Sequence, residues 1–276
     1  MRTRLLPLFL GFLTVFASLA LSSHSDASRT YRILVFRENA IGSAATAQPY
    51  IDKLVAMMAK ANQWSAAEGK YVTRRPRAQR YIEEKKPEFG ILSLGPFLAM
   101  RTKHGLEVVG TAEVARAGGR QYHLISKTAA DLSGCRGQKV ASNHAGDKRF
   151  IEKVVAGGSF TLADFDLMKT RRPVQTIKKV IRGDAVCALI DDAQLAELPH
   201  ISGTAGIRSV WKSAKLPPIA VVAFSGSSAP ERAKFKAALG SLCTGPGKSY
   251  CDKVGIQALK PADQSTYSAV ITAYDK

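Results

Sequence analysis

"KVASNHAGDKRF", residues 139–150, is the most informative stretch of this sequence for its architecture. A short β-type run, 139–142, breaks at Asn-His-Ala-Gly, and a helix is predicted to begin directly afterwards. A strand, a tight loop and a helix N-terminus together form an arrangement in which free backbone amides hold small anions. The stretch therefore predicts a ligand-binding loop, and it opens a second α/β unit that repeats the organisation of the residues before it.

The residues before this stretch alternate between apolar strands and helices. The first predicted strand, "YRILVF" at 31–36, precedes a helix over 45–62 in which Ile51, Leu54, Val55 and Met58 recur at helical spacing. A charged helix that stops before Pro87 is predicted over 77–86, and further strands or extended segments are predicted at 69–75, 88–94, 106–115 and 120–127. This order predicts a mostly parallel sheet that is covered by helices.

The same alternation continues after the stretch. Strands are predicted at 165–170, 185–192 and 216–226, and helices at 147–158, 174–184, 229–243 and 264–274. Two α/β units in tandem predict two lobes: 28–118 plus 205–276 form lobe one, and 119–204 form lobe two. The predicted hinge strands lie near 120–127 and 216–226. Ligands of such sheets bind beyond the carboxyl ends of the strands, which here means the cleft between the lobes.

The N-terminal residues predict a secretory signal peptide over 1–27 and therefore a periplasmic protein. Arg2 and Arg4 precede an apolar run from Leu5 to Leu21, and small polar residues follow. Cleavage sites fit after Ala20 and after Ala27, and the second is preferred because the first strand begins only at Tyr31. An uncleaved membrane anchor is the alternative, since the apolar run approaches the roughly 17–25 residues that a span needs.

The composition favours an anionic partner. The formal net charge is +18, with 40 Lys and Arg against 22 Asp and Glu, and such a charge attracts anionic ligands, anionic surfaces or nucleic acid. Nucleic acid is disfavoured because the chain carries an export signal and no zinc-finger or RNP-type motif. A solvated basic surface is the alternative explanation of the charge.

Four cysteines in an exported chain predict disulfides. Cys243 and Cys251 flank the turn-rich "TGPGKSY", which predicts a local bridge. Cys135 and Cys187 then either pair across a longer loop or remain as buried thiols. Neither spacing resembles a metal-binding motif, so no metal and no cofactor is expected.

The ordered segments of the chain resemble the periplasmic substrate-binding proteins of ABC transporters, in the branch for phosphate, phosphite and phosphonate. The segments that carry the resemblance include "RILVFRENAIGSAATAQPYIDKL" (32–54), "PEFGILSLGPFLAM" (87–100), "PVQTIKKVIRGDAVCALID" (173–191) and "LPPIAVVAF" (216–224). The resemblance covers nearly the whole mature chain. It implies the type II periplasmic-binding-protein fold, in which two lobes are joined by two crossover strands.

The binding loop departs from that family. Its phosphonate binders usually carry a Ser/Thr-rich loop where this chain has Ser142-Asn143-His144-Ala145-Gly146. Asn143 and His144 could still donate hydrogen bonds, although a lone loop histidine is also commonly only solvated. The family's histidine before the next helix is replaced by Arg171 and Arg172, which suit oxyanions but are equally compatible with an exposed surface.

Further candidate ligand-binding residues follow from their positions at strand ends. Because the family can hold a ligand's amino group with lobe-two carboxylates, the resemblance implies such a role for Asp191 or Asp192, although either could instead cap a helix. Tyr122 lies on the crossover, where it could line the cleft or pack in the hinge. The remaining candidates from strand ends and helix starts are Glu38, Asn39, Ser43, Ser93 and Gly95.

The preferred interpretation is a non-catalytic, monomeric binding protein that delivers a small anionic solute to an ABC permease. The alternative is the ligand sensor of a membrane receptor kinase that uses the same fold. An enzyme is not expected, because the sequence contains no Gly-x-Ser-x-Gly, His-Glu-x-x-His or P-loop pattern.

Overall fold

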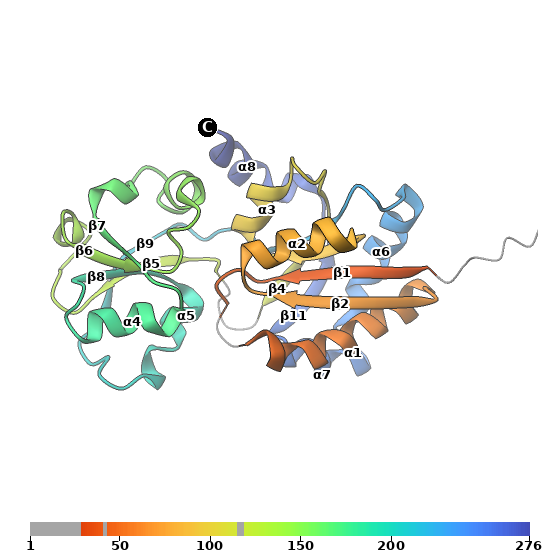
Figure 1. The fold of residues 1–276 in the computed structure, drawn as a ribbon, viewed down its shortest axis with the longest axis horizontal. Coiled ribbons are helices and arrows are strands. Elements are labelled where there is room, and N and C mark those ends of the chain that lie inside the picture. Colours follow the sequence, from red (N-terminus) through yellow and green to blue (C-terminus); the bar gives the residue numbers. More distant parts are fainter. Residues whose placement is uncertain (1–28, 41–42, 115–118) are drawn as a thin grey trace, which may run out of the picture.

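The computed structural model describes residues 29–40, 43–114 and 119–276. The predicted signal peptide lies outside these ranges. The described residues form two lobes, each built on one β-sheet (Figure 1). Among them, no helix combines the length and apolarity that a membrane span requires.

The larger lobe is built on a six-stranded sheet in the order β11-β4-β10-β3-β1-β2. β1 pairs parallel with β2 and β3, whereas β10 and β11 run antiparallel to their neighbours. Its strands are β1 (Thr30–Phe36), β2 (Ala66–Val72), β3 (Phe89–Leu92), β4 (Glu107–Val114), β10 (Ile219–Ala223) and β11 (Ile256–Pro261). Its helices are α1 (Ala44–Asn62), α2 (Arg75–Lys85), α3 (Leu94–Met100), α6 (Ala229–Leu242), α7 (Lys248–Lys253) and α8 (Ser268–Asp275), with short 3₁₀ turns at η5 (Gly245–Gly247) and η6 (Gln264–Tyr267).

Alternating side chains of β1 explain how helices cover both faces of this sheet. Ile33 and Val35 pack with residues of α1 and α6 on one face, and Leu34 and Phe36 pack with residues of α2 and α3 on the other. Every one of these four β1 side chains is buried. A strand apolar on both faces is typical of a sheet that lies between two helical layers.

The smaller lobe is built on a five-stranded sheet in the order β7-β6-β8-β5-β9. Its strands are β5 (Tyr122–Ser126), β6 (Lys139–Ser142), β7 (Asp166–Lys169), β8 (Cys187–Asp191) and β9 (Arg208–Lys212). Its helical segments are η1 (Ser133–Cys135), η2 (Phe150–Val155, a π-helix), η3 (Leu162–Asp164), α4 (Pro173–Ile181), α5 (Asp192–Ala196) and η4 (Leu198–His200). The predicted strand, loop and helix of 139–150 are thus present.

One boundary in the sequence analysis is wrong. Residues from 205 onward were assigned to lobe one, but β9 pairs antiparallel with β5 and belongs to the smaller lobe. Its sequence, "RSVWK", begins and ends with a charged residue, and only Val210 and Trp211 are half-buried, so no apolar alternation marks it as a strand. α7 and β11 were also not predicted.

The two crossings between the lobes are hydrogen-bonded to each other. Among the strands of the described residues, β5 pairs with β8 and β9 alone, and β10 pairs with β3 and β4 alone. Each predicted hinge strand therefore lies within one lobe. Beside them, Leu216 donates its N–H to the Arg120 carbonyl, and the Ser213 hydroxyl accepts from the Tyr122 N–H at 3.0 Å. These bonds join the start of β5 to the segment that precedes β10.

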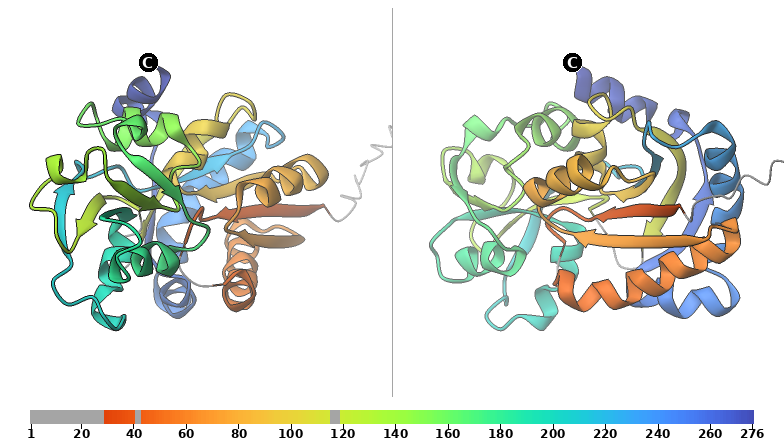
Figure 2. Two further views of the ribbon diagram at one scale, coloured as in Figure 1. Left: turned by 60° about the vertical axis from the view of Figure 1, so that its left-hand side comes forward. Right: turned by 45° about the vertical axis from the view of Figure 1, so that its right-hand side comes forward.

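The lobes also share an apolar core away from the crossings. One continuous cluster contains Phe97 and Tyr274 of the larger lobe together with Phe150 and Ile151 of the smaller lobe. The C-terminal helix α8 packs on η2 of the opposite lobe, as two further views show (Figure 2). The C-terminus of the chain therefore lies beside the lobe that contains β6 and β7.

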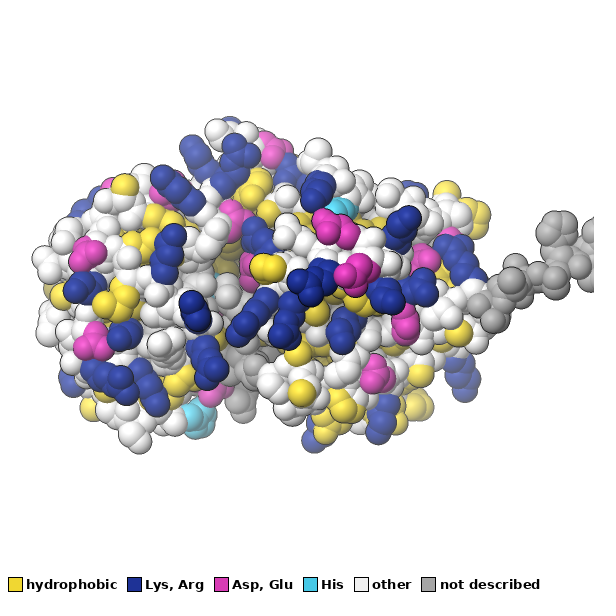
Figure 3. Space-filling view, viewed as in Figure 1, with side chains coloured by type: hydrophobic (Ala, Val, Ile, Leu, Met, Phe, Trp, Pro, Cys, Tyr) yellow, Lys and Arg dark blue, Asp and Glu magenta, His cyan; other side chains and the backbone are white. Residues whose placement is uncertain are grey.

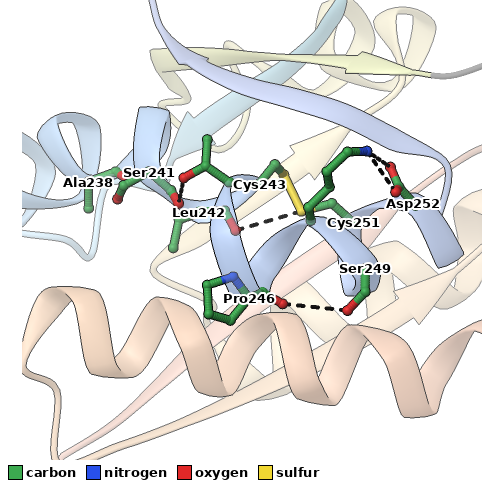
Figure 4. The surroundings of a disulfide bond; sticks show 10 residues. Ala238, Ser241, Leu242, Cys243, Pro246, Ser249, Cys251 and Asp252 are labelled. Atoms are coloured by element: carbon green, nitrogen blue, oxygen red, sulfur yellow. Dashed lines mark hydrogen bonds and ion pairs between the residues drawn. A yellow bond between two sulfur atoms is a disulfide. The ribbon is translucent and has the colours of Figure 1, made fainter.

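All four cysteines are paired. Cys135 at the end of η1 is bonded to Cys187 at the start of β8, and Cys243 after α6 is bonded to Cys251 in α7. The second bridge holds α7 against the end of α6 (Figure 4). The predicted local bridge is therefore present, and of the two alternatives for Cys135 and Cys187, the disulfide is the one formed.

Candidate functional site

A cavity of about 430 Å³ lies between the lobes, beyond the carboxyl ends of β1, β3 and β8. Both lobes contribute to its walls, as expected for α/β sheets whose ligands bind at strand ends. Eight of the predicted binding residues line this cavity: Glu38, Asn39, Ser43, Ser93, Gly95, Tyr122, His144 and Asp191.

The larger lobe supplies the turn after β1 and the start of α1. Asn39 has a φ of 61° in this turn, a left-handed conformation that asparagine tolerates better than most residues. Ser43 is the N-cap of α1, since its Oγ accepts the Thr46 N–H at 3.1 Å. Arg37 and Lys253 also line the cavity and make no ion pair with any described residue.

The loop after β6 directs most of its polar groups inward. Ser142 Oγ donates to the Leu189 carbonyl and accepts the His144 N–H. Asn143 Oδ1 accepts from Thr176 Oγ1 at 2.9 Å and from Gln194 Nε2 at 3.1 Å. Ser142, Asn143, Ala145 and Gly146 do not line the cavity, whereas His144 does. The Ser142 hydroxyl and the side-chain carbonyl of Asn143 are therefore already hydrogen-bonded within the lobe.

His144 and Asp191 form the polar part of the smaller lobe's wall. His144 Nε2 lies 2.6 Å from Gln194 Oε1 and 3.9 Å from Asp191 Oδ2. Asp191 is also the N-cap of α5, because its Oδ1 accepts the Gln194 N–H at 2.8 Å. Asp191 therefore has the helix-capping role that the sequence indicated as an alternative. Its second carboxylate oxygen, Oδ2, faces the His144 imidazole.

Tyr122 lies at the centre of these groups. Its ring packs edge-on against His144 and Phe150, with centroid distances of 5.1 and 5.9 Å. Burial raises the pKa of the Tyr122 hydroxyl well above 10, and the charges of Asp191 and other nearby carboxylates add to the shift. The phenol is therefore neutral at physiological pH and can donate a hydrogen bond into the cavity.

Asp192, which follows β8 as the first residue of α5, faces the first crossing between the lobes. Its Oδ1 accepts the Gly119 N–H at 2.8 Å. Burial raises the pKa of this carboxyl, and the charge of Asp191 acts in the same direction, while the backbone N–H of Gly119 opposes the shift. Asp192 therefore ties α5 to the first crossing, and it does not line the cavity.

Arg75, the first residue of α2, joins both lobes beside the cavity and was not among the predicted residues. Its Nε and Nη2 donate to the two carboxylate oxygens of Glu38 at 2.9 and 2.6 Å, and its Nη1 donates to Asp147 Oδ2 at 3.0 Å. Burial alone would lower the pKa of Arg75, but the hydrogen bonds and charges of both carboxylates outweigh it and raise that pKa.

Asp147 occupies the start of the helical segment that follows the loop. Its Oδ1 accepts the Phe150 N–H at 3.0 Å while its Oδ2 binds Arg75. A carboxylate of the protein itself thus occupies one of the backbone amides at the helix N-terminus, where an anionic ligand was predicted. Arg171 and Arg172 also lie elsewhere, in a neighbouring groove that opens beside this cavity.

No protein-family model and no curated protein matches this sequence. Solved structures do resemble the fold. XAC2383 from Xanthomonas citri bound to chloride ion aligns with a TM-score of 0.71 at 10% identity, covering 89% of this chain and 97% of that one. PhnD1 from Prochlorococcus marinus in complex with methylphosphonate gives 0.66 at 10% identity, with 88% and 96% covered.

A third similar structure is the periplasmic aliphatic sulphonate binding protein SsuA from Escherichia coli. It aligns with a TM-score of 0.58 at 13% identity, covering 89% of this chain and 90% of that one. The chain therefore has the two-lobed periplasmic-binding-protein fold, as the resemblance in the sequence predicts.

Proposed function

We propose that this protein is a non-catalytic, extracytoplasmic solute-binding protein that captures a small anionic solute between its lobes and delivers it to an ABC permease. The observation that carries this proposal is the cavity at the strand ends, which both lobes enclose and in which Arg37 and Lys253 have no carboxylate partner among the described residues. Such cations attract an anion into a concave site. The solutes named for PhnD1 and SsuA, a phosphonate and sulphonates, are of this class.

The wall formed by the smaller lobe adds a second requirement. The Asp191 carboxylate offers hydrogen-bond acceptors, and the His144 imidazole offers an acceptor or a donor. The neutral Tyr122 hydroxyl is a third polar group in this wall. The side chains of Ser142 and Asn143 make internal hydrogen bonds instead. The preferred solute therefore carries its anionic group toward the larger lobe and a hydrogen-bond donor, such as an amino group, toward Asp191.

A thermal-shift screen of the mature protein, residues 28–276, tests this proposal. The panel contains phosphate, phosphite, sulfate, methylphosphonate and 2-aminoethylphosphonate. A ligand present at 100 times its dissociation constant stabilises the folded state by about 2.7 kcal/mol, which raises the midpoint by roughly 5–10 °C in a chain of this size. We expect 2-aminoethylphosphonate to give a larger shift than methylphosphonate, and a flat panel from folded protein would contradict the proposed solute class.

The variant Asp191→Asn separates the two requirements. Asparagine caps helices about as well as aspartate, so the fold of α5 is retained while the negative charge is lost. We expect the preference for the amino-bearing phosphonate to disappear while methylphosphonate binding persists. Asp131→Asn is the matched control, because Asp131 also accepts a backbone N–H in a loop of the same lobe but is exposed and lies outside the cavity.

A further inference from the structure

A second hollow, a groove of about 1130 Å³, adjoins the cavity and is larger than it. The two share Asn39, Ala40, Ser43 and Tyr71 in their walls, so the groove directly adjoins the cavity. We call it the outer groove. Its walls come from both lobes: the start of α1, the end of β2 and α2 on one side, and the residues that begin α4 on the other.

Basic side chains dominate the outer groove. Six Lys or Arg residues line it, against one carboxylate, Glu84: the six are Lys70, Arg74, Arg77, Arg80, Arg171 and Arg172. All six are exposed. The space-filling view shows a band of Lys and Arg side chains that runs over β2 and α2 and continues across the junction onto the smaller lobe (Figure 3).

None of these six side chains makes an ion pair with another described residue. Arginines elsewhere do: Arg75 binds two carboxylates, and Arg32 and Arg136 each bind one. Like charges that surround a hollow repel one another, and low-dielectric walls focus their field into it. The outer groove therefore carries a net positive charge that attracts anions.

The spacing of these cations indicates the shape of the anion. Arg77 and Arg80 are three residues apart in α2, so they lie on neighbouring positions of one helix face, about 4.5 Å apart along its axis. Arg74 is the extended N-cap residue that directly precedes the helix. Arg171 and Arg172 face them from the smaller lobe. Guanidinium groups bind phosphate oxygens in pairs. One orthophosphate can engage only part of this row, whereas a chain of linked phosphates can engage most of it.

We propose that the outer groove is a separate binding site for a soluble oligophosphate, a small molecule with several linked phosphate groups. The site is concave and continues into the cavity, and a flat membrane would reach only its rim. This site goes beyond the proposed function, because it does not depend on which solute the inner cavity takes. An oligophosphate in the groove contacts both lobes and therefore favours their closed arrangement.

Isothermal titration with inorganic tripolyphosphate and with orthophosphate, at equal ionic strength, tests the proposal. We expect tripolyphosphate to bind at least tenfold more tightly, and the double variant Arg77→Glu, Arg171→Glu to weaken it at least tenfold. The control is Lys60→Glu, Lys127→Glu, which changes the net charge equally. Both control residues are exposed and lie outside the groove, and Lys60 lies at the far end of α1.

Each remaining outcome decides against the site. Equal weakening by the groove and control variants would mean that only net charge matters. Equal affinity for orthophosphate and tripolyphosphate would exclude linked phosphates as the ligand. Co-sedimentation with phosphatidylglycerol vesicles is a further arm: vesicle binding that the groove variant abolishes, without any preference for tripolyphosphate, would assign the groove to a membrane surface instead.

Discussion

Arg75 of the larger lobe donates a hydrogen bond to Asp147 of the smaller lobe, with 3.0 Å between Nη1 and Oδ2. The same guanidinium holds Glu38 through its other two nitrogens, so one cation pairs with a carboxylate on each side of the cleft. The side chain of Asp147 is only 10% exposed, and that of Arg75 is 24% exposed. This ion pair therefore links the lobes independently of any solute.

Breaking this link is expected to open the ligand-free protein. Asp147→Asn retains a side chain that can cap the Phe150 N–H but removes the charge that Arg75 binds. Hydrogen bonds to charged groups contribute about 1.5–3 kcal/mol, so the ratio of open to closed molecules should rise about tenfold or more. Small-angle scattering should show a larger radius of gyration.

The control for this experiment is Glu113→Gln, which breaks an exposed ion pair with Lys260 within the larger lobe. That variant should scatter like the wild type. An unchanged profile for Asp147→Asn would show that the shared apolar core alone holds the lobes together.

Gly95 of α3 and Phe150 of η2 approach each other closely across the cleft. A Cβ at position 95 would lie 3.2 Å from the Phe150 ring, closer than side chains normally pack. Gly95→Val should therefore keep the lobes apart and enlarge the radius of gyration. The double variant Gly95→Val, Phe150→Ala should restore a compact particle, and failure of that rescue would locate the effect of Gly95 within its own lobe.

The two disulfides should differ in their contribution to stability. In the chain-entropy account, a bridge stabilises more when it closes a longer loop. The sequence separations are 52 residues for Cys135–Cys187 and 8 for Cys243–Cys251, which correspond to about 4 and about 2.5 kcal/mol. Denaturant titration of the two double Cys→Ala variants measures both values, and a larger loss from the short loop would contradict this account.

Acidification below pH 6.5 should destabilise the fold through two histidines. Burial lowers the pKa of His104 and of His123, and the nearby charges of Lys103 and Lys212 act in the same direction. Once the pH falls below the histidine pKa of the unfolded chain, the unfolded chain binds more protons than the folded chain. The free energy of unfolding therefore decreases as the pH falls from that pKa toward the lower pKa of the folded state. Melting temperatures at pH 7.5 and 5.5 should differ less in His104→Gln, His123→Gln than in the wild type. The exposed His200→Gln is the control.

Local sequence patterns predicted much of the fold. β1, β3, β8 and β10 are short apolar runs, and the residues Ile51, Leu54 and Met58 mark the buried face of α1. β9 was not predicted because "RSVWK" lacks a buried face, and its strand character arises only from pairing with β5.

The candidate site was less predictable, because it depends on contacts between residues distant in sequence. Glu38 and Asp191, which were selected from strand ends as candidate ligand-binding residues, line the cavity. No local pattern indicates that Arg75 bonds to Asp147, 72 positions away, or that Asn143 is bonded to Gln194. Whether a loop side chain is free for a ligand is decided by such partners, and the sequence of the loop alone does not contain them.

The larger lobe is discontinuous in sequence, and this discontinuity affects the order in which the two lobes can fold. The smaller sheet uses one continuous segment, from β5 to β9, whereas the larger sheet needs β10 and β11 from near the end of the chain. During synthesis, the smaller lobe can therefore be completed first. At that stage the larger sheet contains β1 to β4 and still lacks β10 and β11. The larger lobe can assemble only after β10 and β11 have also emerged, so its sheet is completed later than that of the smaller lobe.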